Sequence, residues 1–266
     1  MEAVTEIAVA ALSDTAVVVC LTHTNIRAEC RLLTVDGQTL TRSDTKAVSG
    51  SSSYVGVSSF DATSAIVCYT DSTQSNRPCC NVVTMTTGGT ALEDSSATEV
   101  CHSSTDEAEY VSVAALDPLS AMVCYKSRSG NVGSGRCDLV TRSGATHGAP
   151  LTWSSQRTTF SDTDVQYVSL AALDSQTVLA CYSDASDGSA STCRRLYRGA
   201  NGVSPPVGSL MVHPSASEEH SVARLGPPPN RLGYIDHGSV GEMCDSSVQD
   251  VRQPRLLPAT YPCTPP

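Results

Sequence analysis

Cysteine is the residue type whose spacing in this chain most clearly implies chemistry, and there are 12 of them. Four pairs are separated by 10, 12, 13 and 12 residues: Cys20/Cys30, Cys68/Cys80, Cys124/Cys137 and Cys181/Cys193. Opposed residues on adjacent antiparallel strands lie close enough for a disulfide. Zinc sites use more closely spaced cysteines or histidines that converge on one point. We therefore predict disulfides, with reduced core thiols and metal binding as alternatives.

The other four cysteines complete this pattern. Gly233 stands where a fifth pair would begin, so Cys244 lacks its usual partner and Cys263 is the natural replacement. Cys79 and Cys101 then remain and are predicted to pair with each other. So many regularly spaced cysteines in a chain of β-prone segments suggest an oxidising compartment. We expect an extracytoplasmic location: secreted, at the cell surface, or in an organelle lumen such as the thylakoid lumen.

A Tyr-x-Asp sequence occurs three times, with its carboxylates at Asp71, Asp184 and Asp236. One hypothesis is a ring of sugar or calcium sites, one per repeat. The other is that the tyrosine packs inside the protein and the aspartate starts a turn, which is common turn chemistry. We favour the turn hypothesis and keep the three aspartates as candidate ligand-binding loops.

Other patterns associated with catalysis or metal binding are missing from the sequence. The six histidines are scattered at His23, His102, His147, His213, His220 and His237. They form no His-x3-His or His-Glu-x2-His sequence, and no Gly-x-Ser-x-Gly elbow or glycine-rich phosphate loop is present. Carboxylates are numerous, but no pair stands out as glycosidase acids. We therefore predict no catalytic residues, no metal and no cofactor.

The elements that position these residues belong to an internal repeat. In five segments an apolar anchor is followed 8 residues later by Cys, or by Gly in the fifth: Leu12/Cys20, Phe60/Cys68, Leu116/Cys124, Leu173/Cys181 and Leu225/Gly233. Successive anchors are 48, 56, 57 and 52 residues apart. The words also agree, as in YVGVSSFD, YVSVAALD and YVSLAALD. This regularity indicates one structural unit repeated five times.

Each unit contains four short β-prone segments separated by Asp, Ser, Gly and Asn. Repeated four-stranded sheets are typical of β-propellers, so we predict one all-β, disulfide-stapled propeller domain over residues 1–266 with about five four-stranded blades. The expected blades cover approximately 4–49, 54–106, 110–163, 167–215 and 219–266. The first two strands should pair near Val9/Val18, Val57/Val67, Val113/Val123, Leu170/Leu179 and Val222/Leu232. A β-solenoid and tandem β-sandwiches are the alternatives.

Composition limits the partners. Lys and Arg total 17 and Asp and Glu total 27, giving a net charge of −10. Such an acidic chain without a basic cluster is a poor ligand for nucleic acid or anionic membrane. No apolar run reaches the length of a membrane-spanning helix.

The recurring words YVSVAALD, AMVCYKS and GRCDLVTRSG resemble the tandem repeats of propeller-like proteins from unicellular marine algae, especially dinoflagellates. This resemblance covers the first four units well and the fifth poorly. It implies an algal source and a propeller fold, and it carries over no catalytic residue. The chain is more loosely similar to five-bladed animal lectin propellers, but it lacks their Trp-rich sugar pockets and has Trp153 as its single Trp.

Regular repeats without an asymmetric catalytic set favour a non-enzymatic interaction or scaffold protein, a subunit of a larger assembly with protein partners. The alternative is a carbohydrate-binding lectin with one glycan site per blade. Polar hairpin loops at 70–79, 126–136 and 183–192, together with the divergent fifth unit, are the predicted contact surfaces.

Overall fold

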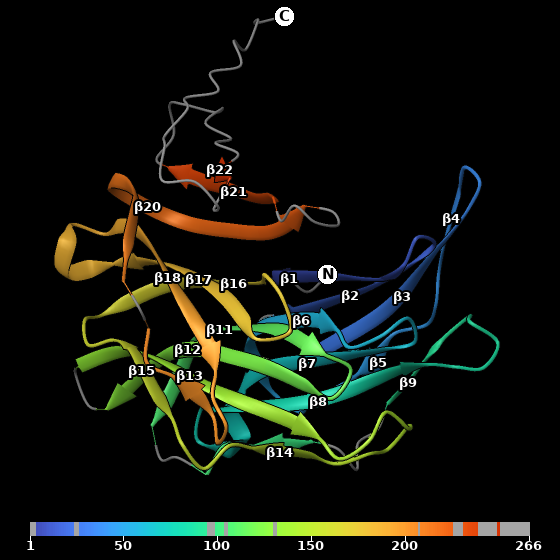
Figure 1. The fold of residues 1–266 in the computed structure, drawn as a ribbon. Helices are drawn as coiled ribbons and strands as arrows, with labels where there is room; N and C mark the ends of the chain where they lie inside the picture. The colour runs from blue at the N-terminus through green and yellow to red at the C-terminus, as the bar shows by residue number, and fades with distance from the viewer. Residues whose placement is uncertain are drawn as a thin grey trace, which may run out of the picture.

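Antiparallel sheets, one per repeat unit, make up the structure (Figure 1). It is a computed structural model that describes residues 4–23, 27–94, 99–103, 106–129, 132–206, 208–225, 231–238 and 249–250. The prediction of an all-β chain built from four-stranded antiparallel sheets is confirmed over these residues. Within them, the helical segments are two short 3-10 turns, η1 (Ser72–Gln74) and η3 (Ala185–Asp187).

The first two sheets, blades 1 and 2, each contain three long strands and a fourth position shared by two short strands. Blade 1 consists of β1 (Val4–Ser13), β2 (Ala16–His23), β3 (Ala28–Asp36), β4 (Thr39–Arg42) and β5 (Lys46–Ala47). Blade 2 consists of β6 (Ser52–Ser59), β7 (Ser64–Asp71), β8 (Arg77–Met85), β9 (Leu92–Asp94) and β10 (Val100–Cys101). In both, the short pair flanks the third long strand.

Blades 3 and 4 repeat this plan. Blade 3 consists of β11 (Glu107–Asp117), β12 (Ser120–Ser129), β13 (Val132–Arg142), β14 (Leu151–Trp153) and β15 (Thr158–Ser161). Blade 4 consists of β16 (Val165–Ala172), β17 (Thr177–Asp184), β18 (Ala190–Arg198), β19 (Val203–Ser204) and the first part of β20 (Leu210–Leu225). The second part of β20 then pairs with β21 (Arg231–Gly238), and β21 pairs with β22 (Gln249–Asp250). These three strands are the described part of the fifth unit.

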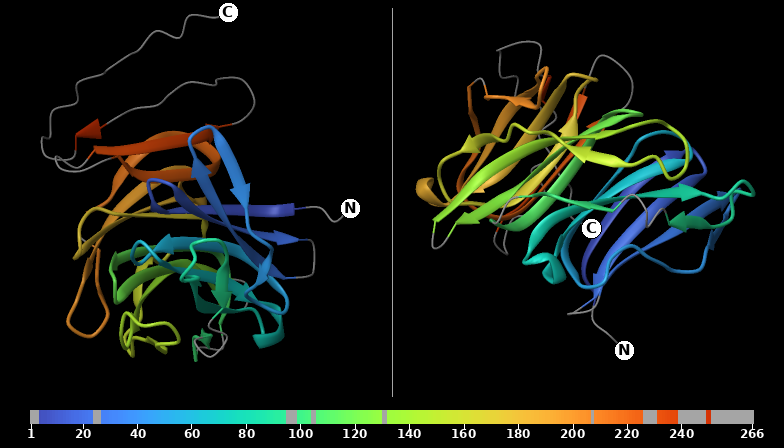
Figure 2. Two further views of the ribbon diagram at one scale, coloured as in Figure 1. Left: turned by 90° about the vertical axis from the view of Figure 1, so that its right-hand side faces the viewer. Right: turned by 90° about the horizontal axis from the view of Figure 1, so that it is seen from below.

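The first strand of every unit lies nearest the centre. Strands β1, β6, β11, β16 and β20 are neighbours in that order, and the sheets fan outward from them (Figures 1 and 2). Together they line an open pocket of about 370 Å³. One residue from each strand lines it at the equivalent position: Val9, Val57, Val113, Leu170 and Val222. This arrangement is propeller-like.

The core lies between blades because each sheet has two apolar faces. We call the face that carries the anchor residue and the cysteine pair the leading face; it packs against the following blade. The opposite, trailing face packs against the preceding blade and carries a fully buried tyrosine in blades 2 to 4: Tyr69, Tyr125 and Tyr182. Alternation along each strand therefore fills two interfaces with one sheet.

Five of the six predicted disulfides are present. Four join directly opposed residues of the second and third strands: Cys20–Cys30, Cys68–Cys80, Cys124–Cys137 and Cys181–Cys193. Cys79–Cys101 links the third strand of blade 2 to β10. The sixth predicted pair, Cys244–Cys263, lies outside the described residues. The bonded pairs support the expectation of an oxidising environment.

Strand pairing follows one register in units one to four. Val57 and Val113 pair with Val67 and Val123 as predicted. The predicted pairs at Val9 and Leu170 are one residue off, because their partners are Val19 and Ala180. In the fifth unit Val222 pairs with Tyr234, which is two residues from the prediction. The divergent unit thus differs in register as well as in sequence.

The predicted hairpin loops are shorter than expected. Residues 126–136 are mostly strand, since β12 runs to Ser129 and β13 starts at Val132. Lys126 explains the extension: its ammonium lies 2.8 Å from Asp164 and 3.4 Å from Glu109, so the polar side chain is buried with partners. The other two loops are similarly reduced, by η1 and η3 and by the early starts of β8 and β18. Polar composition alone therefore overestimated the exposed loop surface.

Candidate functional site

The Tyr-x-Asp sequences form turns in the structure. The carboxylate of Asp71 caps η1 by accepting from the amide and hydroxyl of Thr73 at 2.7 and 2.6 Å. Asp184 caps η3 in the same way through Ser186. The backbone of Asp236 pairs with His220 in the fifth unit, and its side chain lies outside the described residues. Turn formation accounts for the first two aspartates, and a ligand role for the three remains a prediction.

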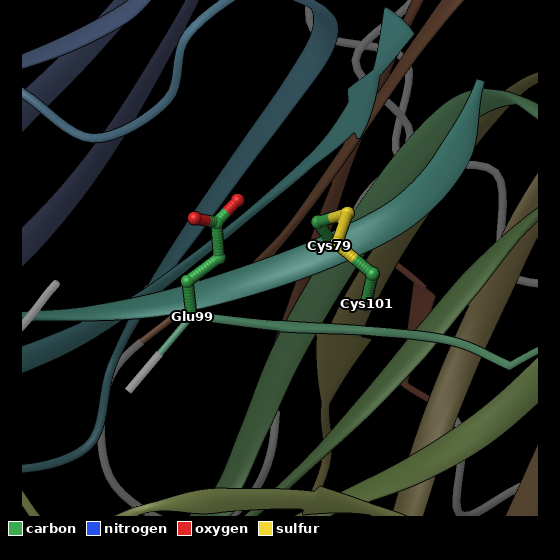
Figure 3. Close-up of side chains that lie close together, drawn as sticks. All are labelled: Cys79, Glu99 and Cys101. Atoms are coloured by element: carbon green, nitrogen blue, oxygen red, sulfur yellow. A yellow bond between two sulfur atoms is a disulfide. The ribbon is translucent and has the colours of Figure 1, made fainter. Parts of the chain in front are cut away.

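Figure 3 shows one group of potential metal donors, Cys79, Glu99 and Cys101. Their donor atoms lie within 4.8 Å of one another. The two sulfurs are bonded to each other, which removes the thiolates that a metal would need. Glu99 instead accepts a hydrogen bond from the hydroxyl of Tyr69 at 3.0 Å. This group is therefore a structural staple between β8 and β10.

Within the described part of the chain, charged and aromatic side chains gather where blades 2 and 3 meet. We call this group the rim cluster, and it consists of His102, Asp106, Asp138, Trp153 and Arg157. His102 follows β10 of blade 2. The other four come from blade 3, where Asp138 stands on β13 directly after the second cysteine and Trp153 ends β14. Residues as far as 55 positions apart in the sequence thus converge at one blade interface.

Arg157 is the centre of the rim cluster. Its Nη1 donates to Oδ2 of Asp106 at 2.8 Å, and its Nη2 lies 2.9 Å from Nδ1 of His102. Its Nε is 3.7 Å from Oδ2 of Asp138. Asp138 is completely buried, and a buried carboxylate requires a charged or hydrogen-bonded partner. Arg157 therefore both neutralises this buried charge and is held in one orientation by it.

Below Arg157, Tyr125 closes the cluster. Its hydroxyl donates to Asp138 at 2.7 Å, and the guanidinium carbon of Arg157 lies 5.9 Å from the centre of its ring. Burial, followed by the negative charge of Asp138, raises the pKa of Tyr125 well above its usual value. The tyrosine therefore stays neutral and donates its proton to the carboxylate.

The outer edge of the rim cluster reaches solvent. The side chains of Arg157 and Asp106 are 20% and 28% exposed. The indole of Trp153 is half-buried, meets the His102 ring edge-on at 5.1 Å between centroids, and donates its N–H to the carbonyl of Val100 at 3.1 Å. A fixed guanidinium, a carboxylate and the indole of Trp153 thus lie side by side at the surface, and the buried ring of His102 packs against them. Such a set suits a polar ligand with an apolar face.

A second unusual feature is a row of tyrosines at one end of the inner strands, which we call the tyrosine arc: Tyr54, Tyr110 and Tyr167. Each stands six residues before its anchor, and neighbouring rings are 5.0 Å apart. All three have left-handed backbones, with φ of 55°, 54° and 52°. Bulky residues rarely adopt this conformation, and here each coincides with a shift in strand register. The bulge turns the three rings toward one another.

The surroundings of the tyrosine arc are acidic. Burial, then Glu109 and Tyr110, raise the pKa of Tyr54 to about 12. Burial also raises the pKa of Tyr110, with contributions from Tyr167 and Glu109. Glu6 occupies the equivalent position in blade 1, where it accepts from the amide of Val55 at 3.0 Å. We interpret the tyrosine arc as a structural contact that holds neighbouring inner strands together.

Neither the rim cluster nor the tyrosine arc is predicted by the sequence patterns. Trp153 as the single Trp and Asp138 at a position held by Asn81 and Arg194 in neighbouring units were the available signals for the rim cluster. Arg157 and His102 lie outside the repeated words, so only the fold brings them together. The repeated Tyr-Val sequences contain the residues of the tyrosine arc, but nothing in those sequences indicated a left-handed backbone.

Comparisons with known proteins bear on the fold. No protein-family model matches the chain, and no curated protein matches it. Among solved structures, AofleA from Arthrobotrys oligospora has a TM-score of 0.57 at 7% identity, covering 92% of this chain and 70% of that one. Aleuria aurantia lectin in complex with Fucα1-6GlcNAc has a TM-score of 0.55 at 13% identity, covering 87% and 71%.

Enzymes share the same architecture. The periplasmic gluconolactonase PpgL of Pseudomonas aeruginosa has a TM-score of 0.55 at 10% identity and covers 87% of this chain and 65% of its own. The Aleuria lectin is described as a six-bladed β-propeller. At these identities the common property is the propeller fold, and function has to be argued from this chain's own side chains.

Proposed function

We propose that this protein is a non-enzymatic carbohydrate-binding propeller and that the rim cluster is its sugar site. The observation that carries the proposal is the fixed Arg157, held by Asp106, His102 and Asp138 beside the single Trp of the chain. The similarity to lectins of the same architecture supports it.

Sugar binding requires polar groups for hydroxyls and an apolar surface for the C–H face of the ring. Each terminal nitrogen of a guanidinium carries two N–H groups in one plane, and Arg157 uses one on each nitrogen within the cluster. The remaining N–H group on each terminal nitrogen can donate to two adjacent sugar hydroxyls. The carboxylate of Asp106 can accept a hydrogen bond from a third. The half-buried ring of Trp153 supplies the apolar surface.

The proposal narrows the expectation of one site per blade to one site between blades 2 and 3. The position after the second cysteine holds Asp138 there, but Arg31, Asn81 and Arg194 in units one, two and four; its counterpart in unit five, Asp245, lies outside the described residues. At the junction of blades 3 and 4, Arg194 donates to the carbonyl of Phe160 at 2.6 Å instead. Equivalent positions thus carry different chemistry, so equal sites are not expected.

A glycan array followed by calorimetry tests the proposal. Asp106→Asn keeps the size of the side chain and removes its charge at a partly exposed position, so the fold should survive. We expect the wild-type protein to bind a defined set of glycans and Asp106→Asn to bind them at least about tenfold more weakly, the loss typical of one charged hydrogen bond. Asp187→Asn, a substitution of an exposed acid in blade 4, is the matched control and should bind normally.

Two outcomes would contradict the sugar site. One is a wild-type protein that binds no glycan on the array. The other is binding that Asp106→Asn and Asp187→Asn leave equally intact, which would place the sugar elsewhere on the propeller. Thermal melts of all three proteins show whether any loss of binding reflects unfolding.

An interaction or scaffold role with protein partners is the second candidate function. It is favoured by large apolar side chains exposed on blade 1, including Ile7 at 66% and Leu40 at 64%. Exposed apolar patches of this kind mark interaction sites. In either role, the disulfides indicate an extracytoplasmic environment, and we propose secretion, the cell surface or an organelle lumen as the location. No helix within the described part is long and apolar enough to cross a membrane. An algal source likewise remains a proposal.

A further inference from the structure

Blade 1 leaves uncovered a face that is covered by a neighbouring blade in blades 2 to 4. This uncovered face is the trailing face of blade 1, which comprises the exposed Ile7 and Val9 and the half-buried Val17, Val19 and Leu21. Ile7 and Val9 are 66% and 59% exposed. Of the eight large apolar side chains that are exposed in the described part of the chain, five belong to blade 1: Val4, Ile7, Val9, Val35 and Leu40.

The gapless repeat allows a residue-by-residue comparison. Val55 and Val67 of blade 2 are the equivalents of Ile7 and Val19, and they are 8% and 0% exposed. In blade 3 the equivalents are Val111 and Val123, at 5% and 0%. The same side chains are thus buried wherever a preceding blade exists. The uncovered face has the composition of a blade interface rather than of a solvent-exposed sheet surface, where alternate residues are polar.

We propose that the uncovered face is a docking site for one further four-stranded sheet of this same repeat, a sixth blade. The occupant follows from the interfaces already present, because the trailing faces of blades 2 to 4 each receive a leading face with an anchor residue and a disulfide. Between blades 3 and 4, for example, Leu116 and Cys124 meet Val168 and Ala180. The complementary partner is therefore a leading face of the same kind.

The number of blades supports a single sheet as the occupant. The 266 residues hold five units, and the Aleuria lectin with the same architecture is a six-bladed propeller. In the described residues the inner strand β1 lies against β6, but β20 of the fifth unit lies against β16 and is not among the main neighbours of β1. If this chain shares that six-bladed plan, its five units leave one position, bordered on one side by the uncovered face.

The first experiment compares two equivalent substitutions in the chain as it is. Val67→Glu places a charge in a covered interface and should lower the melting temperature by about 10 °C or more. Val19→Glu places it on the uncovered face and should shift the melting temperature by no more than about 2 °C. An equally large loss in Val19→Glu would overturn the proposal, because the chain's own fifth unit would then cover the face. So would a wild-type dimer in light scattering that Val19→Glu dissociates, since the occupant would be a second copy.

The second experiment supplies the sixth blade. Val165 of blade 4 and Val4 of blade 1 both lie eight residues before their anchors, so a copy of residues 110–164 joined directly to Val4 continues the repeat. This fusion should melt several degrees higher than the wild-type chain and should lose binding of a hydrophobic dye. Val19→Glu within the fusion should now cost about as much as Val67→Glu. A fusion that melts like the wild-type chain and still tolerates Val19→Glu would show that the face does not accept a blade.

Discussion

The hydroxyl of Tyr125 lies 2.7 Å from Oδ2 of Asp138, and neither side chain is exposed to solvent. A hydrogen bond to a buried charge contributes more than one between neutral groups. We therefore expect Tyr125→Phe to lower the free energy of unfolding by about 1.5–3 kcal/mol. Urea denaturation measures this loss. The control is Tyr197→Phe at a half-buried position of blade 4, and a similar loss there would argue against a special role for the Asp138 pair.

Arg157 and Asp138 should be coupled. Arg157→Met leaves the buried carboxylate without its arginine partner and should cost about 3–5 kcal/mol. In the double variant Arg157→Met/Asp138→Asn the unpaired charge is gone, so part of this loss should be recovered. Chemical denaturation of the wild type, both single variants and the double variant gives the coupling energy. Strictly additive losses would mean that Arg157 stabilises the fold without acting on Asp138.

Gly135 permits the close packing of β13 on Phe160. A Cβ atom at Gly135 would lie 2.5 Å from the Phe160 ring, which is completely buried and has little room to move. Gly135→Ala should therefore destabilise the protein by about 1–3 kcal/mol through overpacking. Gly88→Ala is the matched control, since its nearest contact would be 3.7 Å away. Equal melting temperatures for the two variants would contradict the packing described here.

The tyrosine arc predicts a loss of stability at high pH. The pKa of Tyr54 is raised to about 12, so between its ordinary value of 10.0 and 12 the folded state keeps a proton that the unfolded state releases. This contribution to stability is complete below pH 10 and disappears as the pH rises toward 12. Melting temperatures should fall over that window, and less steeply in Tyr54→Phe. Identical slopes in the two proteins would remove Tyr54 as the cause.

The intra-blade disulfides should stabilise the fold individually. Cys124–Cys137 closes a loop of 13 residues, for which the chain-entropy model gives about 2–3 kcal/mol. The double variant Cys124→Ala/Cys137→Ala should lose roughly that amount in urea. Peptide mapping without reduction should recover the five bonded pairs and also tests the predicted Cys244–Cys263 pair. Free thiols at Cys124 and Cys137 would contradict the predicted oxidising environment.

Local patterns in the sequence were sufficient to predict the strands and disulfides of each blade. The anchor-to-cysteine step places Leu116 and Cys124 on the same face of their hairpin, because strand residues alternate with a period of two. The same arithmetic predicted the Cys124–Cys137 bond across the next hairpin. Asp71 and Asp184 were predictable as turn residues because capping depends on neighbours two positions away.

Tertiary structure alone decided what lies between the blades. His102 and Arg157 are 55 residues apart, and no local rule relates them; they meet because blade 2 stacks on blade 3. Val19 and Val67 have the same side chain at the same repeat position, yet one face is covered and the other is not, since coverage depends on the number of neighbouring blades. A repeat determines each sheet through short-range alternation, whereas the contacts of its two faces are determined by the order in which the sheets stack.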